Sequence, residues 1–500
     1  MLRKLQIRGL YLIPILMMAL LCYSVFSESV YLGAADDAFF YFRIAENYVS
    51  DGFLSFDGLT ATNGFHPLWM GALVLLRFLV SNPASYLTAV FVLSAILMTI
   101  CGIQFIRFNR YRYSFPVMLV ILPILLRYLR DFALMCMETS ILLPVSFALL
   151  SVVSRLNAKS SKGEYWAVGV LVAVMGAARL DSVLLGFLIL LYVYKSFGKR
   201  VLLPCTIPGI VFALSYIWAN FLLTGGLTSV SSMMKASGFG LNQLFVSQLF
   251  LFSDPLGFRS PWGLYLLLML ASIPTLFIKN IPATAKISSL FLLSYTAAQL
   301  FFSQWRLWYW YAYPAVIFLA YGMPSVLQLM FSKLSFPETF RSAALILMFC
   351  AVFLLSIYWG LSYGQVEQSD FRYRNMLIAQ ELNGRLPDSI LIAMGDRAGS
   401  FAYFFNGHVL QSEGLAGDIS LVEAIQGGLL EEHLNALEVD YILSWTGPHL
   451  VDEYECWDIV IPDRAQCRAF NNVIRIYGEN EAARWTGEND SVFLWSFHEN

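Results

Sequence analysis

Residues 33–69 read GAADDAFFYFRIAENYVSDGFLSFDGLTATNGFHPLW, and this stretch separates a first apolar run from all the later ones. Directly after the acidic pair Asp36 and Asp37, apolar side chains recur at steps of three and four residues. They belong to Phe39, Phe42, Ala45 and Val49. This spacing is typical of an amphipathic helix on a membrane surface. The sequence therefore predicts a surface helix over residues 35–49.

The segment that follows, Pro67 to Val80, is apolar but only 14 residues long, and it contains Arg77. A helix needs about 20 apolar residues to cross a bilayer. We therefore expect this segment to lie in the outer interface, or to dip into the membrane and return. Residues 27–85 then form one outer loop, and loops of this length without a function are uncommon.

On both sides of this loop the chain consists of apolar runs. Apolar residues make up 58% of the protein, charged residues 13%, and the mean hydropathy is +0.64, whereas a soluble domain carries about a quarter charged residues. The first run lacks a clean signal-peptide cleavage site, so we interpret it as an uncleaved helix. We predict eleven membrane spans, near residues 10–26, 86–106, 115–132, 139–155, 165–178, 182–195, 201–223, 261–278, 287–303, 311–331 and 341–361.

The distribution of Lys and Arg predicts how these spans are oriented. With a cytoplasmic N-terminus, the predicted inner loops hold 16 of the 24 Lys and Arg residues within residues 1–361. Cytoplasmic loops are enriched in these residues. An odd number of spans then places residues 362–500 outside the cytoplasm. The predicted domains are thus a membrane bundle, residues 1–361, and an extracytoplasmic domain, residues 362–500.

The C-terminal segment has the charge density of a globular domain. Strands are predicted over residues 389–394, 407–412, 441–445, 473–477 and 491–497, and a helix over residues 421–437. This mixture predicts an α/β domain. Its two cysteines, Cys456 and Cys467, would be free to form a disulfide in an extracytoplasmic compartment, although spacing alone cannot show the required geometry.

Several function classes have no support in the sequence. The net charge is −2, and no basic patch of the kind that follows nucleic-acid phosphates is present, so we expect no nucleic-acid partner. The C-terminal segment shows no nucleotide-binding loop, Ser-His-Asp set or zinc-ligand spacing.

The string DDAFFYFRIAEN…DG…SFDG…TNGFHPLW resembles the first outer loop of the GT-C superfamily of membrane glycosyltransferases. That superfamily includes protein O-mannosyltransferases, the lipid A aminoarabinose transferase, arabinofuranosyltransferases and the oligosaccharyltransferase catalytic subunit. The resemblance covers the membrane domain in layout, and it is residue-specific in the first loop and at a few later positions. It implies a bacterial inner-membrane enzyme that transfers a sugar, with inversion, from a polyprenyl-phosphate donor to an extracytoplasmic glycan, lipid or protein.

The resemblance also implies that Asp36 is the essential carboxylate of this loop, with Asp37 as the alternative. An acceptor hydroxyl must lose a proton as it attacks the anomeric carbon, and a carboxylate can take that proton. Some family members use the carboxylate to hold a divalent metal instead, such as Mg²⁺ or Mn²⁺, and both roles stay open here. Without the resemblance, the two residues would be expected simply to cap the helix and complement its dipole.

A second acidic residue of the family matches Glu138, at the outer start of the fourth span. A carboxylate at the edge of a bilayer is costly unless it is paired or hydrated. We expect Arg127 and Arg130, from the same outer segment, to be its partners. A purely structural ion pair is the alternative to a catalytic role.

Four residues are candidates for binding the donor phosphate: His66, Arg179, Lys235 and Arg306. His66 stands before a proline where some relatives have Lys, and Lys235 matches a family Lys that follows a Ser-containing stretch. Arg306 lies among Trp and Tyr residues, and a guanidinium binds phosphate oxygens with two parallel hydrogen bonds. The alternatives are a backbone-bonded His, a local ion pair at Arg179, a solvated Lys and an Arg stacked on indole.

Two other classes of function remain to be weighed: a transporter of a lipid-linked saccharide and a non-catalytic member of the family. Transporters place charges near the bilayer midplane, often on repeated halves. Here the candidate charges lie at one face of the membrane and no internal repeat is visible. The sequence therefore favours an enzyme acting at the membrane surface.

Overall fold

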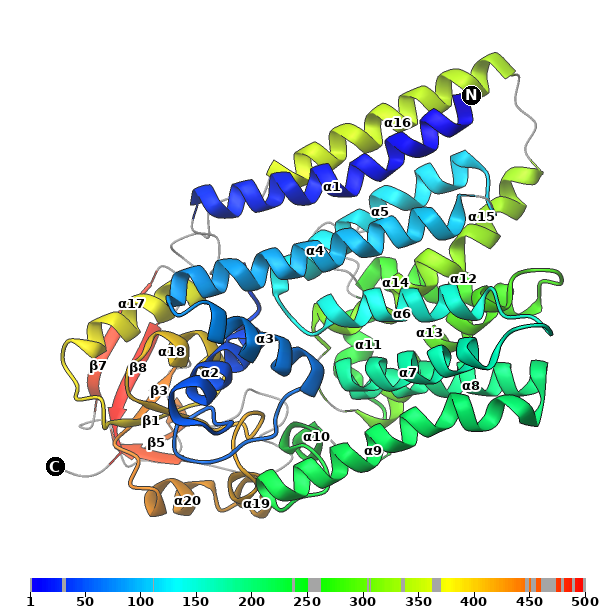
Figure 1. The fold of residues 1–500 in the computed structure, drawn as a ribbon. Coiled ribbons are helices and arrows are strands. Elements are labelled where there is room, and N and C mark those ends of the chain that lie inside the picture. Colours follow the sequence, from blue (N-terminus) through cyan, green and yellow to red (C-terminus); the bar gives the residue numbers. More distant parts are fainter. Residues whose placement is uncertain are drawn as a thin grey trace.

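The computed structural model places most of the chain. It describes residues 2–28, 33–110, 112–235, 239–250, 262–303, 305, 307–333, 338–361, 370–445, 449–450, 456–459, 474–477, 481–487 and 491–497. Figure 1 shows a long bundle of helices, with a smaller sheet-containing part at one end of it.

Helices cover each of the predicted spans. The long ones are α1 (Leu2–Glu28), α4 (Pro83–Asn109), α5 (Phe115–Met135), α6 (Thr139–Val153), α7 (Lys162–Ala178), α8 (Val183–Phe197), α9 (Leu202–Thr224), α12 (Trp262–Phe277), α13 (Ala283–Phe302) and α16 (Glu338–Leu361). The span predicted near residues 311–331 is a run of three elements, η4 (Tyr309–Ala312), α14 (Tyr313–Tyr321) and α15 (Met323–Ser332). Within the described ranges, six helical segments are long and apolar enough to cross a membrane. The number of spans therefore stays a prediction.

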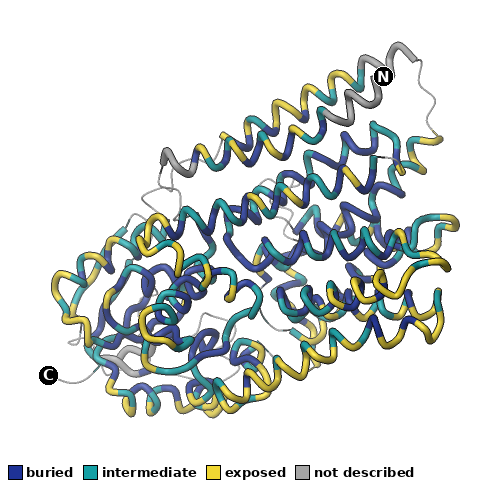
Figure 2. The backbone as a smooth tube through the Cα atoms, viewed as in Figure 1, coloured by how far each residue is buried: buried dark blue, intermediate teal, exposed yellow. Residues whose placement is uncertain are grey.

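The outward faces of the bundle carry apolar side chains. Along α9, for example, Leu203, Leu214, Trp218 and Leu222 are each more than 60% exposed. The tube in Figure 2 shows that exposed residues also line the outer sides of α1 and α16. A soluble protein rarely exposes apolar surface on this scale, so these faces are suited to contact with lipid.

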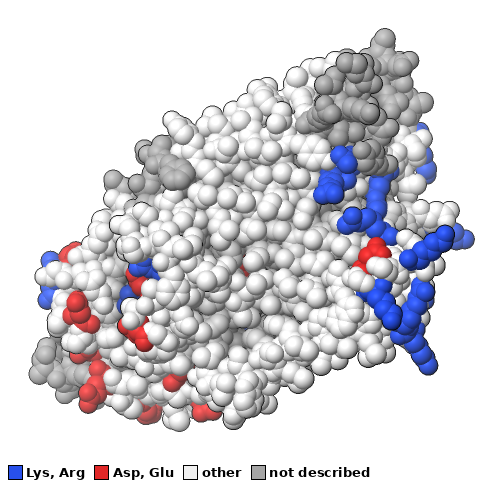
Figure 3. Space-filling view, viewed as in Figure 1, with Lys and Arg blue, Asp and Glu red and all other residues white. Residues whose placement is uncertain are grey.

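Basic side chains gather at the end of the bundle that lies opposite the sheet, as Figures 1 and 3 show. The loops at that end also contact one another. Arg112 donates a hydrogen bond to Ser154 Oγ (3.0 Å), and Arg200 donates one to the carbonyl oxygen of Ala158 (3.0 Å). Both arginines belong to loops that the charge distribution predicts to be cytoplasmic.

The predicted surface helix is α2 (Asp36–Asp51), which ends at Gly52 in a left-handed conformation (φ 84°). Its apolar side chains do not face solvent or lipid: Phe39 and Phe42 are almost completely buried. The ring of Phe39 contacts Tyr403 (5.7 Å between ring centroids), and the ring of Phe42 contacts Tyr86 (5.9 Å). The helical period therefore marks packing against protein. The next segment forms α3 (Pro67–Leu79).

The C-terminal part contains a five-stranded sheet of order β2-β1-β3-β8-β7. Strand β1 (Leu391–Met394) runs parallel to β2 (His408–Gln411) and β3 (Tyr441–Ser444), whereas β8 (Ser491–Ser496) is antiparallel to both β3 and β7 (Glu481–Thr486). A second sheet joins β4 (His449–Leu450), β5 (Cys456–Ile459) and β6 (Ile474–Tyr477). All five predicted strands are present, which confirms the mixed α/β character.

Four helices accompany these strands: α17 (Phe371–Asn383), α18 (Ala398–Phe404), α19 (Ile419–Gly427) and α20 (Leu430–Ala436). The single helix predicted over residues 421–437 is in fact two, because Gly428 adopts a left-handed conformation (φ 71°) that ends α19. Cys467 lies outside the described residues, so the predicted disulfide is not described.

Candidate active site

The TNGFHP stretch joins the outer loop to its neighbours. Asn63 Nδ2 donates to Asn220 Oδ1, Thr224 Oγ1 and the carbonyl oxygen of Thr228, each at 3.1 Å, and Asn63 Oδ1 accepts from Val230 N (2.9 Å). One buried amide thus links the end of α9 to the start of α10 (Val230–Lys235). Because α10 ends at Lys235, Asn63 fixes the helix that carries this cation.

Between these segments lies a cavity of about 360 Å³ at the end of the bundle that faces the C-terminal sheet. The loop before α3, the turn between α7 and α8, α10, the end of α13 and η4 all contribute to its wall. Among its described residues, the acidic, basic and histidine side chains are Asp37, His66, Glu138, Arg179, Asp181 and Lys235. Five of these six residues are candidates from the sequence analysis, and the sixth, Asp181, follows Arg179 by two positions in the chain.

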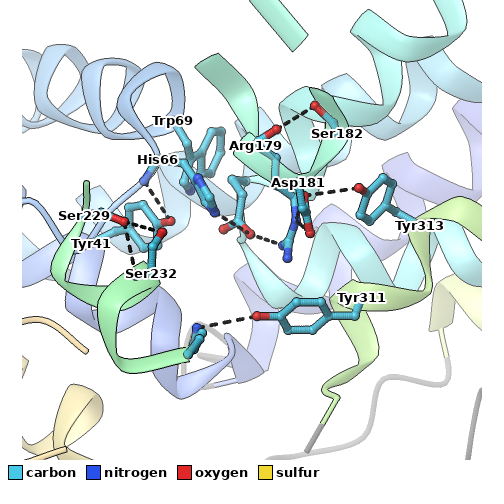
Figure 4. Close-up of polar contacts among 12 residues, drawn as sticks. Tyr41, His66, Trp69, Arg179, Asp181, Ser182, Ser229, Ser232, Tyr311 and Tyr313 are labelled. Carbon is cyan, nitrogen blue, oxygen red and sulfur yellow. Dashed lines mark hydrogen bonds and ion pairs between the residues drawn. The ribbon is translucent and has the colours of Figure 1, made fainter. Parts of the chain in front are cut away.

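Arg179 and Asp181 lie side by side in the wall of this cavity (Figure 4), and with Glu138 they form one ion-paired group. Arg179 Nη1 donates to Glu138 Oε1, and Arg179 Nε donates to Asp181 Oδ1 (2.9 Å). The hydroxyls of Tyr295 and Tyr313 donate to Asp181 at 2.9 and 3.1 Å. The side chains of Glu138 and Arg179 are only 2% and 3% exposed. Partners of this kind are what allow charges to be buried.

The predicted partners of Glu138 are wrong. Arg127 and Arg130 pair instead with Asp131, at 3.8 and 3.4 Å. All three of these residues lie on α5, whereas Glu138 directly precedes α6 and pairs with Arg179, which follows α7. The partner of Glu138 is therefore Arg179, which is close in space, and not the arginines that are close in sequence.

On the side of the cavity formed by α10, Lys235 lies among groups that can hydrogen-bond. Its Nζ donates to Tyr311 OH (3.5 Å) and lies 5.8 Å from the centre of the Trp305 ring. Earlier in the same helix segment, the hydroxyls of Ser229 and Ser232 are hydrogen-bonded to each other (2.7 Å). Both serines line the cavity. This side therefore offers a cation and several hydroxyls.

The acidic pair is divided between two environments. Asp37 lines the cavity, whereas Asp36 is not among the residues that line it. Asp36 Oδ2 accepts from Gly399 N (2.9 Å), and its Oδ1 accepts from Ser400 N (2.8 Å) and Ser400 Oγ (2.6 Å). Asp36 therefore binds the C-terminal part of the chain, and Asp37 is the carboxylate of the pair that reaches the cavity.

The environment shifts two pKa values in the cavity. Burial, together with the carboxylates of Asp36 and Glu138, raises the pKa of Asp37 to about 7 against the opposing effect of Lys235. Burial lowers the pKa of His66 to about 4 despite the nearby Glu138. At neutral pH, His66 is thus uncharged, and Asp37 is divided between its two protonation states.

For Lys235, burial lowers the pKa, but the neighbouring Tyr311 and Asp37 outweigh this effect, and the net pKa lies above its ordinary value. Lys235 is therefore a cation throughout the physiological pH range. It is also the one ammonium group among the described residues of the cavity wall.

Two buried polar atoms of the cavity lack the partners that such atoms usually have, and a third group keeps a hydrogen that it can donate. Glu138 Oε2 and His66 Nδ1 have no hydrogen-bond partner among the described residues. Tyr41 OH accepts from His66 N (3.2 Å), and no described group accepts its own hydrogen. Together they leave one end of the cavity able both to accept and to donate hydrogen bonds.

The sequence did not identify every residue of this cavity. Tyr41 and Tyr311 belong to aromatic runs in the sequence, and Leu415 comes from the C-terminal part, in which the sequence analysis names no site residue. Arg306, a predicted phosphate-binding residue, lies outside the described residues. In the part of the chain that the structure describes, no three His, Cys, Asp or Glu side chains are grouped so as to hold a metal ion. The alternative that Asp36 or Asp37 holds Mg²⁺ or Mn²⁺, which the resemblance leaves open, is therefore given no step in the reaction.

Comparison with solved structures identifies the fold. ArnT from Cupriavidus metallidurans bound to undecaprenyl phosphate matches over 97% of both chains, with a TM-score of 0.55 and 11% sequence identity. The same protein in the apo state matches over 80% of this chain and 89% of that one, with a TM-score of 0.47 and 12% identity. No protein-family model and no curated protein matches the sequence. The chain thus has the fold of ArnT, a GT-C protein, which confirms the resemblance at the level of fold.

Proposed function

Proceeding from this GT-C fold, we propose that the chain is a membrane glycosyltransferase that uses a polyprenyl-phosphate sugar as its donor. The observation that carries the proposal is a single cavity lined by a carboxylate of raised pKa, Asp37, and a buried ammonium group, Lys235. ArnT, which shares the fold, has been crystallised with undecaprenyl phosphate. Such a pair of groups suits a reaction that removes a proton at one atom and releases an anion at another.

Lys235 is assigned to the donor phosphate. An ammonium group in a buried site stabilises negative charge far better than one in water. The hydroxyls of Tyr311, Ser229 and Ser232 lie beside it and can donate hydrogen bonds to phosphate oxygens. Because His66 is uncharged at neutral pH, we assign it to hydrogen bonding and not to charge pairing with the phosphate.

The donor sugar is assigned to the end of the cavity that contains Glu138, His66 and Tyr41. Glu138 Oε2 supplies an unpaired acceptor, the Tyr41 hydroxyl supplies a hydrogen to donate, and His66 Nδ1 is an unpaired atom whose role depends on the tautomer. Sugar hydroxyls both donate and accept hydrogen bonds, so they fit this arrangement. Arg179, predicted to bind phosphate, is assigned to holding Glu138 and Asp181 in place.

The proposed reaction is a single displacement. Asp37 takes the proton of the acceptor hydroxyl while the acceptor oxygen forms a bond to the anomeric carbon of the sugar. The bond between that carbon and the phosphate oxygen breaks, and the polyprenyl phosphate leaves with the electron pair, stabilised by Lys235. Attack opposite the leaving group inverts the configuration at the anomeric carbon. The acceptor is an extracytoplasmic glycan, lipid or protein.

We propose that the cavity opens on the extracytoplasmic side of a bacterial inner membrane. The basic loops gather at the far end of the bundle (Figure 3), and such loops favour the cytoplasm. The cavity and the C-terminal sheet lie at the other end. A donor held there would have its phosphate at the membrane surface and its polyprenyl chain in the lipid.

The test is sugar transfer by the purified protein in liposomes. A panel of radiolabelled polyprenyl-phosphate sugars is incubated with cell-envelope acceptors, and the label is followed by chromatography. We expect wild-type transfer for one donor, a loss of at least about 100-fold for Asp37→Asn, and normal transfer for Asp51→Asn, an exposed carboxylate on the same helix.

Two outcomes would contradict the proposal. Equal transfer by wild type and Asp37→Asn would remove this carboxylate from the mechanism. Movement of intact labelled lipid across the liposome membrane, without transfer of the sugar, would instead identify the protein as a transporter of a lipid-linked saccharide.

A further inference from the structure

The three hydrogen bonds that Asp36 accepts from Gly399 N, Ser400 N and Ser400 Oγ, which we call the Asp36 clasp, join residues more than 360 positions apart in the chain. The clasp connects the first turn of α2 to the first turn of α18. Hydrogen bonds to an ionised carboxylate are among the stronger ones in proteins. The next residue after Asp36 is the cavity carboxylate, Asp37.

The C-terminal side of the clasp is fixed before it meets Asp36. Asn375 Nδ2 donates to Ser400 Oγ (2.9 Å) and to the carbonyl oxygen of Arg397 (2.8 Å), and Asn375 Oδ1 accepts from Trp445 Nε1 (2.9 Å). Since Ser400 Oγ accepts a hydrogen from Asn375, its own hydrogen is free to point toward Asp36. This network of side chains therefore orients the hydroxyl as a donor.

Glycine at position 399 is required for this close approach. A Cβ atom there would lie 2.2 Å from the carbonyl oxygen of Asp36 and 2.9 Å from its Oδ2. Atoms at such distances overlap severely. The two backbones are thus in contact, and the position of one sets the position of the other.

A second contact holds the residues just before the clasp. Arg372 Nη1, from α17, donates to the carbonyl oxygens of Gly33 (3.0 Å) and Ala34 (2.6 Å). On the other side, Ala35 N donates to the carbonyl oxygen of Met135 at the end of α5 (3.2 Å). The start of α2 is therefore held between the bundle and the C-terminal part.

The C-terminal part also contacts the other walls of the cavity. Thr62, four residues before His66, donates a hydrogen bond from its Oγ1 to the carbonyl oxygen of Gly417 (2.7 Å). Met233, two residues before Lys235, accepts one at its carbonyl oxygen from Gln426 Nε2 (3.3 Å). Each segment that carries one of these cavity residues thus has its own contact with the C-terminal part.

We propose that Asp36 is a positioning residue, whose clasp with α18 fixes the first turn of α2 so that Asp37 faces the cavity. The inference rests on the proposed function, in which Asp37 is the base of the transfer reaction. It gives the C-terminal part a role as a component of the active site, because α18 supplies the groups that hold the base in place. It also explains why two adjacent carboxylates are present: Asp36 binds α18, and Asp37 faces the substrate in the cavity.

Transfer kinetics test the role of the clasp. We expect Ser400→Ala to lower kcat on the order of tenfold with little change in KM for the donor, because a displaced base acts after binding. Ser400→Thr keeps the hydroxyl and should restore most of the loss. Gly399→Ala should lower kcat at least as much as Ser400→Ala. The matched control is Ser420→Ala, a surface serine of α19 whose only described partner is Asp418.

The pH profile separates positioning from a direct catalytic role of Asp36. Removing the charge of Asp36 in Asp36→Asn should move the acidic limb of kcat/KM to lower pH, since Asp36 raises the pKa of Asp37, and measurable transfer should remain. Asp36→Asn as inactive as Asp37→Asn would overturn the proposal. Wild-type kinetics and an unchanged pH profile in both Ser400→Ala and Gly399→Ala would overturn it as well.

The position of the side chain at residue 37 can also be tested without measuring transfer. Such a test distinguishes a failure of this proposal from a failure of the proposed function. In an Asp37→Cys variant of the full chain, the rate of modification of Cys at position 37 by a small methanethiosulfonate is measured by peptide mass. We expect Ser400→Ala, added to this variant, to change that rate several-fold, whereas an unchanged rate would contradict the positioning role. A wild-type protein without transfer activity would count against the proposed function alone.

Discussion

At the scale of single residues, the acidic pair shows what a sequence can and cannot decide. The motif identified Asp36 and Asp37 as a functional pair and favoured Asp36 as the base. Successive residues of a helix point about 100° apart, so the two carboxylates must face different surroundings. Which of them meets the cavity depends on α18, whose residues are more than 360 positions away. No local pattern contains that information.

The pKa of Asp37 leads to a prediction about pH. A base must be deprotonated to act, so kcat/KM should rise with pH through about 7, where burial places the pKa of Asp37. At pH 6, about one tenth of the free enzyme would carry the ionised form, and the rate should be about tenfold below its plateau. The measurement is kcat/KM between pH 5.5 and 8.5. A profile that is flat across this range would show that Asp37 is not the base.

The pair of Glu138 and Arg179 leads to a prediction about stability. Arg179→Met removes the partner of two carboxylates, Glu138 and Asp181, and leaves Glu138 buried with its charge uncompensated. We expect a loss of about 3–5 kcal/mol in the free energy of unfolding, measured in detergent by tryptophan fluorescence. Glu138→Gln added to this variant should recover part of the loss, since the buried charge is then gone. Equal stability of wild type and Arg179→Met would contradict a structural role for this pair.

At the scale of elements, the sequence predicted those helices and strands that depend on apolar composition and on the period of the apolar residues. The apolar runs coincide with helices, and the alternation of the C-terminal segment gave all five predicted strands. It missed α17 and α18, whose short or polar sequences have no clear period. It also assigned the apolar face of α2 to the membrane surface, because a period shows that a face is buried but not what buries it.

The contact between the TNGFHP loop and the C-terminal part can be tested through one glycine. A Cβ atom on Gly64 would lie 2.2 Å from the carbonyl oxygen of Leu415, so Gly64→Ala forces these two segments apart. We expect a loss of about 1–3 kcal/mol in the free energy of unfolding, and a fall in transfer because both segments line the cavity.

The matched control is Gly71→Ala in α3, where an added Cβ meets no atom within 4 Å. Alanine favours a helix over glycine by about 1 kcal/mol, so this variant should be as stable as wild type or slightly more so. A loss of stability at Gly71 equal to that at Gly64 would mean that the contact with Leu415 is not the cause.

At the scale of the whole molecule, the basic loops and the candidate active site lie at opposite ends. The cavity and the C-terminal sheet occupy one end of the bundle, and the basic loops occupy the other (Figures 1 and 3). This separation follows from the charge distribution in the sequence once the helices are packed side by side. The division into residues 1–361 and 362–500 stays a prediction, and the contacts at Asp36, Thr62 and Met233 show that the two parts meet around the cavity.

The orientation of the bundle gives the last prediction. The loop between α6 and α7 and the end of α2 lie at opposite ends of the molecule (Figure 1), and each carries an exposed residue, Lys159 in the loop and Asp51 in α2. If basic loops stay in the cytoplasm, a membrane-impermeant maleimide added to intact cells should label Asp51→Cys and leave Lys159→Cys unlabelled. After permeabilisation both should react, which controls for accessibility. The reverse pattern would place the cavity in the cytoplasm, where an extracytoplasmic acceptor could not reach it.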